Sequence, residues 1–268
     1  MKQIVPSMTL VREGVCEGCQ YPIKVYETKL IGGPRKGERV EVTYGCKCED
    51  IKLAKQALEN KERSEKRRVK EYFDYYSLIS ERLKKATLDN YIPQNKSQQI
   101  AKESAKKYIE IFSLDNPINL LFIGSYGVGK SHLAKAITDG IMKKENPKTK
   151  RKYTAIFISV PKLLRKIRST YNRNSEISEA DIFDVLERVD LLVLDDIGAE
   201  RQNDWTSERL FDIIDSRQGM HTIYTSNYNE RDLFDLLGER NFSRIVNEDT
   251  KIIEIVGDNY RLSDLNLA

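Results

Sequence analysis

The segment from Gly124 to Ser131, with the sequence GSYGVGKS, constrains this chain more than any other stretch. It satisfies the pattern GxxxxGK[ST] in full, and it lies between the apolar run 118–123 and the amphipathic stretch 130–144. Glycines let consecutive N–H groups turn toward phosphate oxygens, and the N-terminus of a following helix adds partial positive charge. The pattern predicts a buried strand, a phosphate-binding loop and a helix, and a glycine-rich turn that matches by chance is the alternative.

The side chains of this loop have different expected roles. Lys130 is expected to reach the terminal phosphates of a nucleotide, and the Ser131 hydroxyl is expected to hold magnesium. His132 stands just inside the helix, where packing or capping is a more natural role than chemistry. The expected nucleotide-binding residues are Gly124, Ser125, Tyr126, Gly127, Val128, Gly129, Lys130, Ser131 and His132.

Two carboxylates follow a second apolar run about sixty residues later in the chain. The run 191–194 (LLVL) ends in Asp195 and Asp196. A parallel strand buried on both faces places polar residues at its carboxyl end, where ligands bind in such sheets. We expect Asp195 to contact magnesium, directly or through a water, and Asp196 to orient or deprotonate the attacking water. Because Asp is shorter than Glu, slow turnover is predicted; acids that only solvate a loop are the alternative.

Strands and helices are expected to alternate from residue 118 to residue 256. This alternation is typical of an α/β fold with a parallel sheet and crossover helices. The expected strands are 118–123, 154–160, 191–194, 222–225 and 251–256. The expected helices are 130–144, 161–171, 179–188 and 206–217, with further helical segments near Leu233 and Ile245.

Charge is unevenly distributed and divides the chain into parts. Residues 51–85 carry eleven Lys and Arg against six Asp and Glu, a surplus larger than the net charge of +4 of the whole chain. Apolar residues recur there at helical spacing, at Val69, Tyr72, Phe73, Tyr76, Ile79 and Leu83. The sequence therefore predicts a module at 1–50, a basic helical linker at 51–86 and an α/β domain at 87–268.

Composition excludes several classes of protein. No apolar run approaches the roughly 18 to 20 residues that span a bilayer, and residues 1–10 lack the apolar core of a signal peptide, so we expect a cytoplasmic protein without membrane contact. The chain has only two histidines, His132 and His221, which argues against histidine-rich metallohydrolases and HExxH proteases.

Four cysteines lie in the front module, as the pairs Cys16/Cys19 and Cys46/Cys48. Each pair is able to chelate one ion, and the turn-rich segment between the pairs, which includes a strand expected at 39–44, brings them together. Four thiolates suit tetrahedral zinc, and a module this small gains most of its fold from the metal. A redox pair and unliganded structural cysteines are the alternatives, and the CxC spacing is less usual than CxxC.

Four motifs stand in an order that resembles an AAA+ ATPase, and more narrowly a DnaC/DnaI-type helicase loader of bacteria and their phages. They are TLDNY at 87–91, the phosphate loop, DDIGAE at 195–200 and TSN at 225–227. The resemblance covers residues 87–261 well and the front module loosely. It implies a five-stranded AAA+ core with a reduced or absent lid, ATP as the nucleotide, single-stranded DNA binding by the core, and a front module that contacts a ring helicase.

The resemblance assigns expected roles to three further residues. Asn227 matches the first sensor, Arg244 matches the arginine finger that reaches the nucleotide of a neighbouring subunit, and Arg261 matches the second sensor. The alternatives are a turn-initiating asparagine, a helix ion pair of Arg244 with Glu248, and a basic residue near the end of the chain. If Arg244 acts on a neighbour, the working unit is a multimer.

The function that these observations favour is an ATP-dependent loader that places a replicative ring helicase on single-stranded DNA. An IstB-type transposition helper ATPase, an ATP-switched adaptor with little hydrolysis, and a zinc-bearing DNA-binding regulator with a vestigial core are the alternatives. The basic segment with Tyr72, Phe73, Tyr75 and Tyr76 is suited to attract phosphates and stack bases, but the same helical spacing equally predicts a buried stripe.

Overall fold

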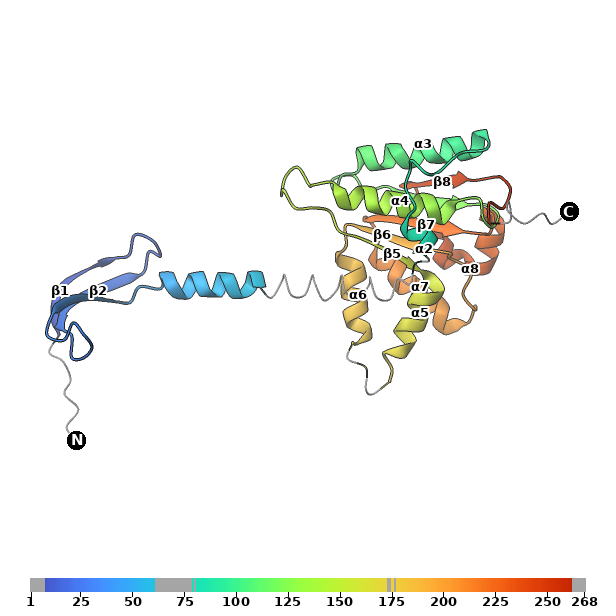
Figure 1. Cartoon of the computed structure of the whole chain (residues 1–268). Helices are drawn as coiled ribbons and strands as arrows, with labels where there is room; N and C mark the ends of the chain where they lie inside the picture. The colour runs from blue at the N-terminus through green and yellow to red at the C-terminus, as the bar shows by residue number, and fades with distance from the viewer. Residues whose placement is uncertain (1–7, 61–78, 80, 173–174, 176, 262–268) are drawn as a thin grey trace. The chain divides into compact units, whose positions relative to one another are not determined.

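The computed structural model describes residues 8–60, 79, 81–172, 175 and 177–261 (Figure 1). The chain separates into two compact units, Met1–Lys70 and Glu71–Ala268. Of the apolar stripe predicted in the linker, Ile79 and Leu83 pack against the core of the larger unit, and the other members lie outside the described residues. No helix in the described part of the chain has the length and apolar character needed to cross a membrane.

The larger unit is built on a five-stranded parallel sheet with the order β5-β6-β7-β4-β8. Each strand overlaps a strand predicted from the sequence, and the α/β fold of the AAA+ type is confirmed. The side chains of β4, β6 and β7 are buried along their whole length, because helices cover both faces of the sheet. The strands are β4 (Asn119–Ile123), β5 (Ala155–Ser159), β6 (Leu191–Asp195), β7 (His221–Ser226) and β8 (Thr250–Glu254).

Helices α3 and α4 lie on one face of this sheet, and α5 to α8 lie on the other (Figure 1). Helix α8 replaces the two helical segments expected near Leu233 and Ile245, with a break at Gly238, whose φ is 73°. The helices are α2 (Glu81–Lys84), α3 (Lys96–Ile111), α4 (Lys130–Lys143), α5 (Val160–Ser169), α6 (Glu179–Arg188), α7 (Asp204–Ser216) and α8 (Glu230–Ile245).

Helix α3 has no counterpart among the elements expected from the sequence. The Asn95 side chain caps its first turn by accepting a hydrogen bond from the backbone N–H of Gln98. Its buried face contains Ala101, Ala105 and Tyr108. Small side chains let α3 lie close to α4, but they give a weak hydrophobic pattern along the sequence, which is why the pattern alone does not reveal the helix.

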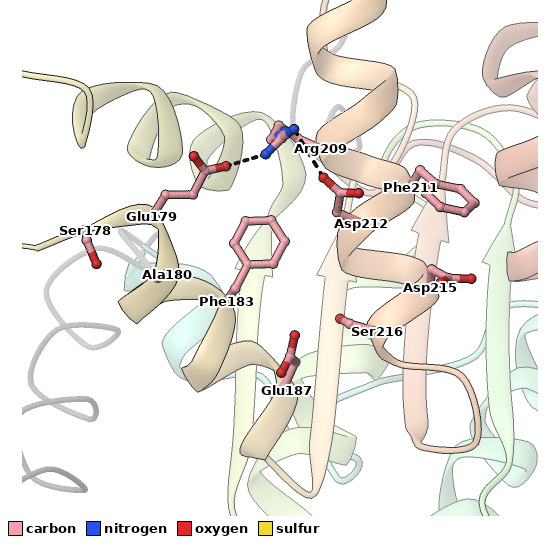
Figure 2. A pocket seen from close by; sticks show the side chains of 10 residues that line it. All are labelled: Ser178, Glu179, Ala180, Phe183, Glu187, Arg209, Phe211, Asp212, Asp215 and Ser216. Carbon is pink, nitrogen blue, oxygen red and sulfur yellow. Dashed lines mark hydrogen bonds and ion pairs between the residues drawn. The ribbon is translucent and has the colours of Figure 1, made fainter.

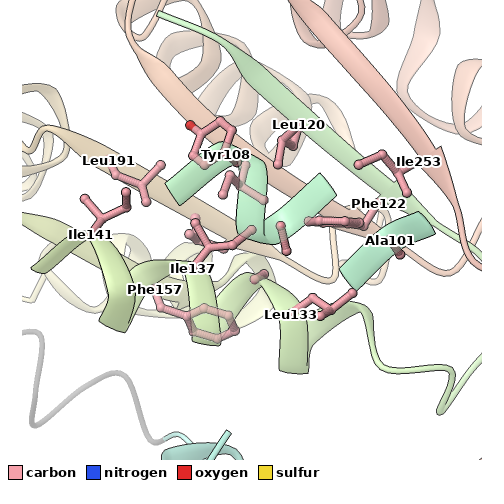
Figure 3. Close-up of a cluster of buried hydrophobic side chains, with 14 of the residues drawn as sticks. Ala101, Tyr108, Leu120, Phe122, Leu133, Ile137, Ile141, Phe157, Leu191 and Ile253 are labelled. Carbon is pink, nitrogen blue, oxygen red and sulfur yellow. The ribbon is translucent and has the colours of Figure 1, made fainter. Parts of the chain in front are cut away.

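The core between α3, α4 and the sheet fixes the base of the phosphate loop (Figure 3). Leu120 and Phe122 of β4 meet Leu133, Ile137 and Ile141 of α4, and all five side chains are at most 2% exposed. Burying one such side chain contributes about 1.5–3 kcal/mol. The strand before the loop and the helix after it are thereby held in one packed layer.

The smaller unit is a three-stranded antiparallel sheet with the order β1-β2-β3, followed by helical backbone at 48–60. Its strands are β1 (Thr9–Val15), β2 (Pro22–Lys29) and β3 (Arg39–Tyr44), of which only β3 was expected from the sequence. Among the described residues of this unit, Val25 and Thr28 alone are buried. So small an apolar core contributes little to the stability of this unit, so a bound metal would supply a large share of it.

Candidate nucleotide site and cysteine centre

The carboxyl ends of the parallel strands bring the predicted site residues together. The phosphate loop follows β4, Asp195 ends β6, and Asn227 follows β7. Ile123, the last residue of β4, pairs with Ser226 of β7, so the loop begins directly beside Asn227. Segments about 70 and 100 residues from the loop in sequence therefore share one edge of the sheet, the edge at which such sheets bind ligands.

Lys130 is the buried cation of this edge, at 4% exposure. Its Nζ donates hydrogen bonds to the carbonyl oxygens of Gly124 at 2.9 Å and Ser125 at 2.7 Å, and to Asn227 Oδ1 at 2.8 Å. Burial lowers the pKa of Lys130 to about 8, although the charges of Asp196 and Asp195 act in the opposite direction. The ammonium group is thus held over the loop by neutral oxygen atoms, which an anionic ligand would outcompete.

Asp195, the last residue of β6, is the buried carboxylate described at this edge and is 5% exposed. Its Oδ1 accepts a hydrogen bond from Thr225 Oγ1 at 2.7 Å, and the Ser131 side chain also hydrogen-bonds to it. Burial, reinforced by the charge of Asp196, raises the pKa of Asp195 to about 6. A carboxylate and a hydroxyl side by side are oxygen ligands of the kind that magnesium prefers, so these two residues fit the metal expected here.

Asp196 has a left-handed backbone, with a φ of 58°. Aspartate tolerates this conformation better than most residues. Its N–H donates to Thr225 Oγ1 at 2.9 Å, and its Oδ1 accepts from Asn227 Nδ2 at 3.4 Å. Asn227 therefore bridges Lys130 and Asp196, between the sheet edge and the loop, where the resemblance expects a first sensor.

Thr225 is a site residue that the sequence reasoning missed. Its hydroxyl donates to Asp195 and accepts from the N–H of Asp196, and the residue is fully buried. One hydroxyl thus sets the direction of the Asp195 carboxylate and the backbone turn at Asp196. The available signal was a threonine near the end of a strand buried on both faces, where a polar side chain needs a buried partner.

The motif at 87–91 packs against the phosphate loop. A Cβ added at Gly129, whose φ is 103°, would lie 2.4 Å from Cε2 of Tyr91. The Tyr91 hydroxyl donates to the carbonyl of Val128 at 3.2 Å, and His132 Nε2 lies 2.8 Å from the carbonyl oxygen of Thr87. His132 therefore connects the loop helix to this motif.

The four cysteines of the smaller unit come together in one cluster. All four Sγ atoms lie within 4.8 Å of one another, and Cys16 Sγ is 3.6 Å from both Cys46 Sγ and Cys48 Sγ. A tetrahedral zinc ion with Zn–S bonds of about 2.3 Å requires sulfur separations of about 3.8 Å. Gly18 makes room for the cluster, because a Cβ there would lie 2.9 Å from Cys48 Sγ. The residues fit zinc.

The thiols of this cluster differ in acidity. Backbone N–H groups of Cys19 and Gly18 lower the pKa of Cys16 to about 6, and the Lys47 N–H also lowers that of Cys19. The Cys16, Cys46 and Cys19 side chains raise the pKa of Cys48 to about 12. Thiolates this close repel one another, so four of them require a bound cation.

One known protein family matches the larger unit and part of the smaller one. Residues 53–268 match the family described as IstB-like ATP binding protein. The chain belongs to this family. Membership implies that the IstB-like chain binds ATP.

Curated relatives of this IstB-like chain include two proteins named replicative helicase loader DnaC. The one from Buchnera aphidicola subsp. Schizaphis graminum is 28% identical over 185 residues, which are 68% of this chain and 72% of the relative. The one from Escherichia coli K12 is 30% identical over 161 residues, 59% of this chain and 62% of the relative. A crystal structure of the DnaC helicase loader matches with 29% identity and a TM-score of 0.57, covering 66% of this chain and all of that one.

Arg261 and Arg244 occupy opposite edges of the sheet in the IstB-like protein. Arg261 follows β8 at the carboxyl edge, where its charge contributes to the lowered pKa of Lys130. Arg244 lies near the end of α8, and its carbonyl accepts a hydrogen bond from Gln218, three residues before β7 begins. Since β7 begins at the amino edge, Arg244 is not brought to the phosphate loop of its own chain.

Arg244 forms an ion pair with Asp215 of α7, with Nε 3.0 Å from Oδ1, and not the pair with Glu248 that was its alternative. Both side chains are nearly half exposed, so the pair is easily broken. Asp215 and Phe211 also line a groove of about 680 Å³ between α6 and α7, in which Arg209 contacts Glu179 and Asp212 (Figure 2). This groove is separate from the residues of the nucleotide site.

Proposed function

We propose that this IstB-like protein is an ATP-dependent loader that places a replicative ring helicase on single-stranded DNA. The observation that carries the proposal is the hydrogen-bonded chain from Lys130 through Asn227 to Asp196 at the carboxyl edge of the sheet. It joins a phosphate-binding cation to a carboxylate through a polar side chain, as a nucleotide-sensing ATPase requires. The names of the curated DnaC relatives support the class of partner.

The chemistry assigned to the site follows from the contacts of each residue. Lys130 exchanges the carbonyls of Gly124 and Ser125 for phosphate oxygens when ATP binds. Ser131 and Asp195 would hold magnesium, which supplies charge neutralisation for the transferring phosphoryl group. Asp196 orients the attacking water, and Asn227 connects that carboxylate to the lysine at the terminal phosphate.

Slow hydrolysis is part of this proposal. The Asp196 side chain is short, and its backbone is fixed in the left-handed region by the bond of its N–H to Thr225. The reach of the carboxylate toward the phosphate is therefore limited to what rotation of this short side chain allows. Slow turnover suits a protein that uses its nucleotide state to control an association, because the bound state then lasts long enough to act.

Assembly is required for full activity under this proposal. Arg244 lies at the amino edge of its own sheet, and an exposed, weakly paired arginine is free to reach a neighbouring chain. An arginine that neutralises charge on a transferring phosphoryl group contributes roughly three to five orders of magnitude in rate. We assign Arg244 to a neighbour's site and Arg261 to its own.

We assign contact with the helicase to the smaller unit and contact with single-stranded DNA to the larger one. Four cysteines arranged for zinc give the smaller unit a fixed shape despite its small apolar core, and a fixed shape is what a docking module requires. We place the protein in the cytoplasm, where replication and single-stranded DNA are found.

A loading assay tests the proposed function. The purified protein is incubated with the ring helicase that it captures from a lysate, ATP and circular single-stranded DNA, and the helicase bound to DNA is measured. We expect loading that requires ATP and is lost with Lys130→Ala. Asp196→Ala separates a working ATPase from an ATP-switched adaptor, because an adaptor would still load when hydrolysis is removed.

A transposition helper ATPase is the second candidate function. The family match over residues 53–268 favours it, since IstB-like proteins give that family its name. The four-cysteine cluster favours the loader. Identification of the captured partner decides between them: a hexameric helicase supports the loader, and a transposase supports the helper. Intact Lys130, Asp195 and Asn227 contacts argue against a regulator with a vestigial core.

A further inference from the structure

The segment 255–261, which we call the strap, crosses the phosphate loop after β8. The Ile255 N–H donates to the carbonyl of Ile123 at 2.8 Å and extends the pairing of β8 with β4. Further along, the Tyr260 N–H donates to the carbonyl of Gly127 at 3.2 Å, and the Ser125 hydroxyl donates to the carbonyl of Gly257 at 3.4 Å. The strap therefore follows the loop from the end of β4 to its middle.

Helix α3 holds the start of the strap in place. Asn95 Nδ2 donates to the carbonyl of Val256 at 2.9 Å, and the Ser97 hydroxyl accepts from the Val256 N–H at 3.0 Å. A Cβ on Gly257 would lie 2.5 Å from Nε2 of Gln98, so the strap also packs closely on this helix. With one end fixed, the path of the remaining residues depends on what they meet at the loop.

Asn259 meets the loop at Gly127. Its Oδ1 lies 1.8 Å from the position that a Cβ on Gly127 would occupy. The same oxygen accepts a hydrogen bond from the backbone N–H of Arg261 at 3.0 Å, which closes a turn of the Asx type. One carboxamide thus fills the space left by the missing side chain of Gly127 and bends the chain that leads to Arg261.

We propose that Asn259 is a positioning residue that couples the phosphate loop to Arg261 and so sets where this arginine stands relative to the terminal phosphate. The inference rests on the proposed function, because it requires ATP at this loop. Asn259 acts through Arg261, whose charge already influences Lys130. Lys130 is assigned to the terminal phosphates. Loss of Asn259 therefore weakens the binding of ATP more than the binding of ADP.

The test compares Asn259→Ala with the unaltered protein and with Asp258→Ala, an exposed neighbour on the same strap. Affinities for ADP and for a non-hydrolysable ATP analogue are measured, together with the hydrolysis rate. We expect Asn259→Ala to weaken binding of the analogue and to slow hydrolysis by about tenfold each, with ADP affinity changed by less than about twofold. Equal effects on ADP and the analogue, or equal effects of Asp258→Ala, overturn the proposal.

A double-mutant cycle tests the contact itself. Gly127→Ala places a Cβ in the space of the Asn259 carboxamide and also strains the backbone, whose φ is 78°. The strain is the same in both backgrounds. We therefore expect the factor by which Gly127→Ala reduces affinity for the analogue to be at least about threefold smaller in the Asn259→Ala background than in the unaltered protein. Additive effects contradict the contact.

Hydrogen exchange on the unaltered protein covers the case in which a variant fails to fold. The amides of the strap should exchange more slowly with the ATP analogue than with ADP, since Arg261 engages only the longer ligand. Identical exchange with both ligands overturns the proposal. Failure of the unaltered protein to bind either nucleotide is a different result, because it removes the proposed function itself.

Discussion

The Asn227 side chain accepts a hydrogen bond from Lys130 Nζ at 2.8 Å and so connects the end of β7 to the first residue of α4. The two partners are separated by 97 residues in the chain. The contact joins the lysine at the phosphate loop to the side chain that also contacts Asp196, which is the kind of preorganised polar arrangement that favours the chemical step.

Replacing Asn227 should separate binding from hydrolysis. In Asn227→Ala, the carbonyls of Gly124 and Ser125 still hold Lys130 over the loop until phosphate oxygens replace them, so we expect ATP affinity to change by less than about threefold. The link to Asp196 is lost, and hydrolysis should fall by about tenfold or more. Calorimetry and a steady-state phosphate-release assay measure the two effects. Lys130→Ala is the matched variant, and equal losses of affinity in both variants would contradict this division of roles.

Thr225 should be needed for both stability and hydrolysis. Thr225→Val keeps the shape of the side chain but leaves Asp195 Oδ1 and the Asp196 N–H without their shared partner. We expect the free energy of unfolding to fall by about 1–3 kcal/mol and hydrolysis to fall with it. Denaturant unfolding gives the stability change. Thr225→Ser retains the hydroxyl, and a serine variant as inactive as the valine variant would show that the hydroxyl is not the cause.

Removing the metal should affect the smaller unit alone. A strong chelator is expected to take zinc from Cys16, Cys19, Cys46 and Cys48 and to raise hydrogen exchange in residues 8–60, because little else holds that sheet. ATP binding should persist, since the nucleotide site lies in the other unit. Metal content, thiol reactivity and exchange are followed together. Unchanged exchange in protein shown to be free of metal would refute a structural metal.

Arg244 should act between chains. Mixing Arg244→Ala with Lys130→Ala allows an intact arginine to face an intact nucleotide site across one interface in the mixture. We expect each variant alone to be inactive and the mixture to recover hydrolysis about tenfold or more above either. Asp215→Asn is the control, because it breaks the ion pair and leaves the arginine in place. A mixture no more active than its parts argues against action on a neighbour.

His221 should make folding stability depend on pH. Burial lowers the pKa of His221, and the charge of Arg217 lowers it further, against hydrogen bonds to Ser113 and Ile118 that raise it. The unfolded chain then binds more protons than the folded one below the ordinary pKa of about 6.5. Stability is therefore full above that pH and falls as the pH drops through the lower folded value.

The comparison for this prediction is His221→Gln. The glutamine does not titrate, so its unfolding midpoint should change less between about pH 7 and about pH 5.5 than that of the unaltered protein, even if it is lower throughout. Thermal unfolding in matched buffers at constant ionic strength gives both profiles. Parallel profiles would show that another group causes the loss of stability in acid.

Sequence patterns predicted the site residues that directly follow a buried strand. The phosphate loop at 124–131 and the acids at 195–196 each follow a buried strand, so their position at the carboxyl edge follows from the apolar runs that precede them. Thr225 and Asn259 were not predicted as site residues. Their roles come from partners 30 and more than 100 residues away, and no local pattern records such a pairing.

The fold was predictable to a similar extent. The five strands of the sheet are apolar runs, and each was expected within a few residues of its observed position. Helix α3 buries alanine and serine, and β1 exposes every one of its side chains, so neither gives a strong hydrophobic pattern. The order of the strands depends on long-range pairing, which the spacing of the motifs does not record.

The position of β4 between β7 and β8 has a consequence for how the chain is made. Leu120 pairs with Ile223 on one side and with Lys251 on the other, so both neighbours of this strand leave the ribosome more than a hundred residues after it. The surroundings of the loop that follows β4 are therefore complete only after residues 221–254 have been synthesised. We expect ATP to stabilise only nascent chains that extend past β8, so shorter nascent chains reach that stage without its help.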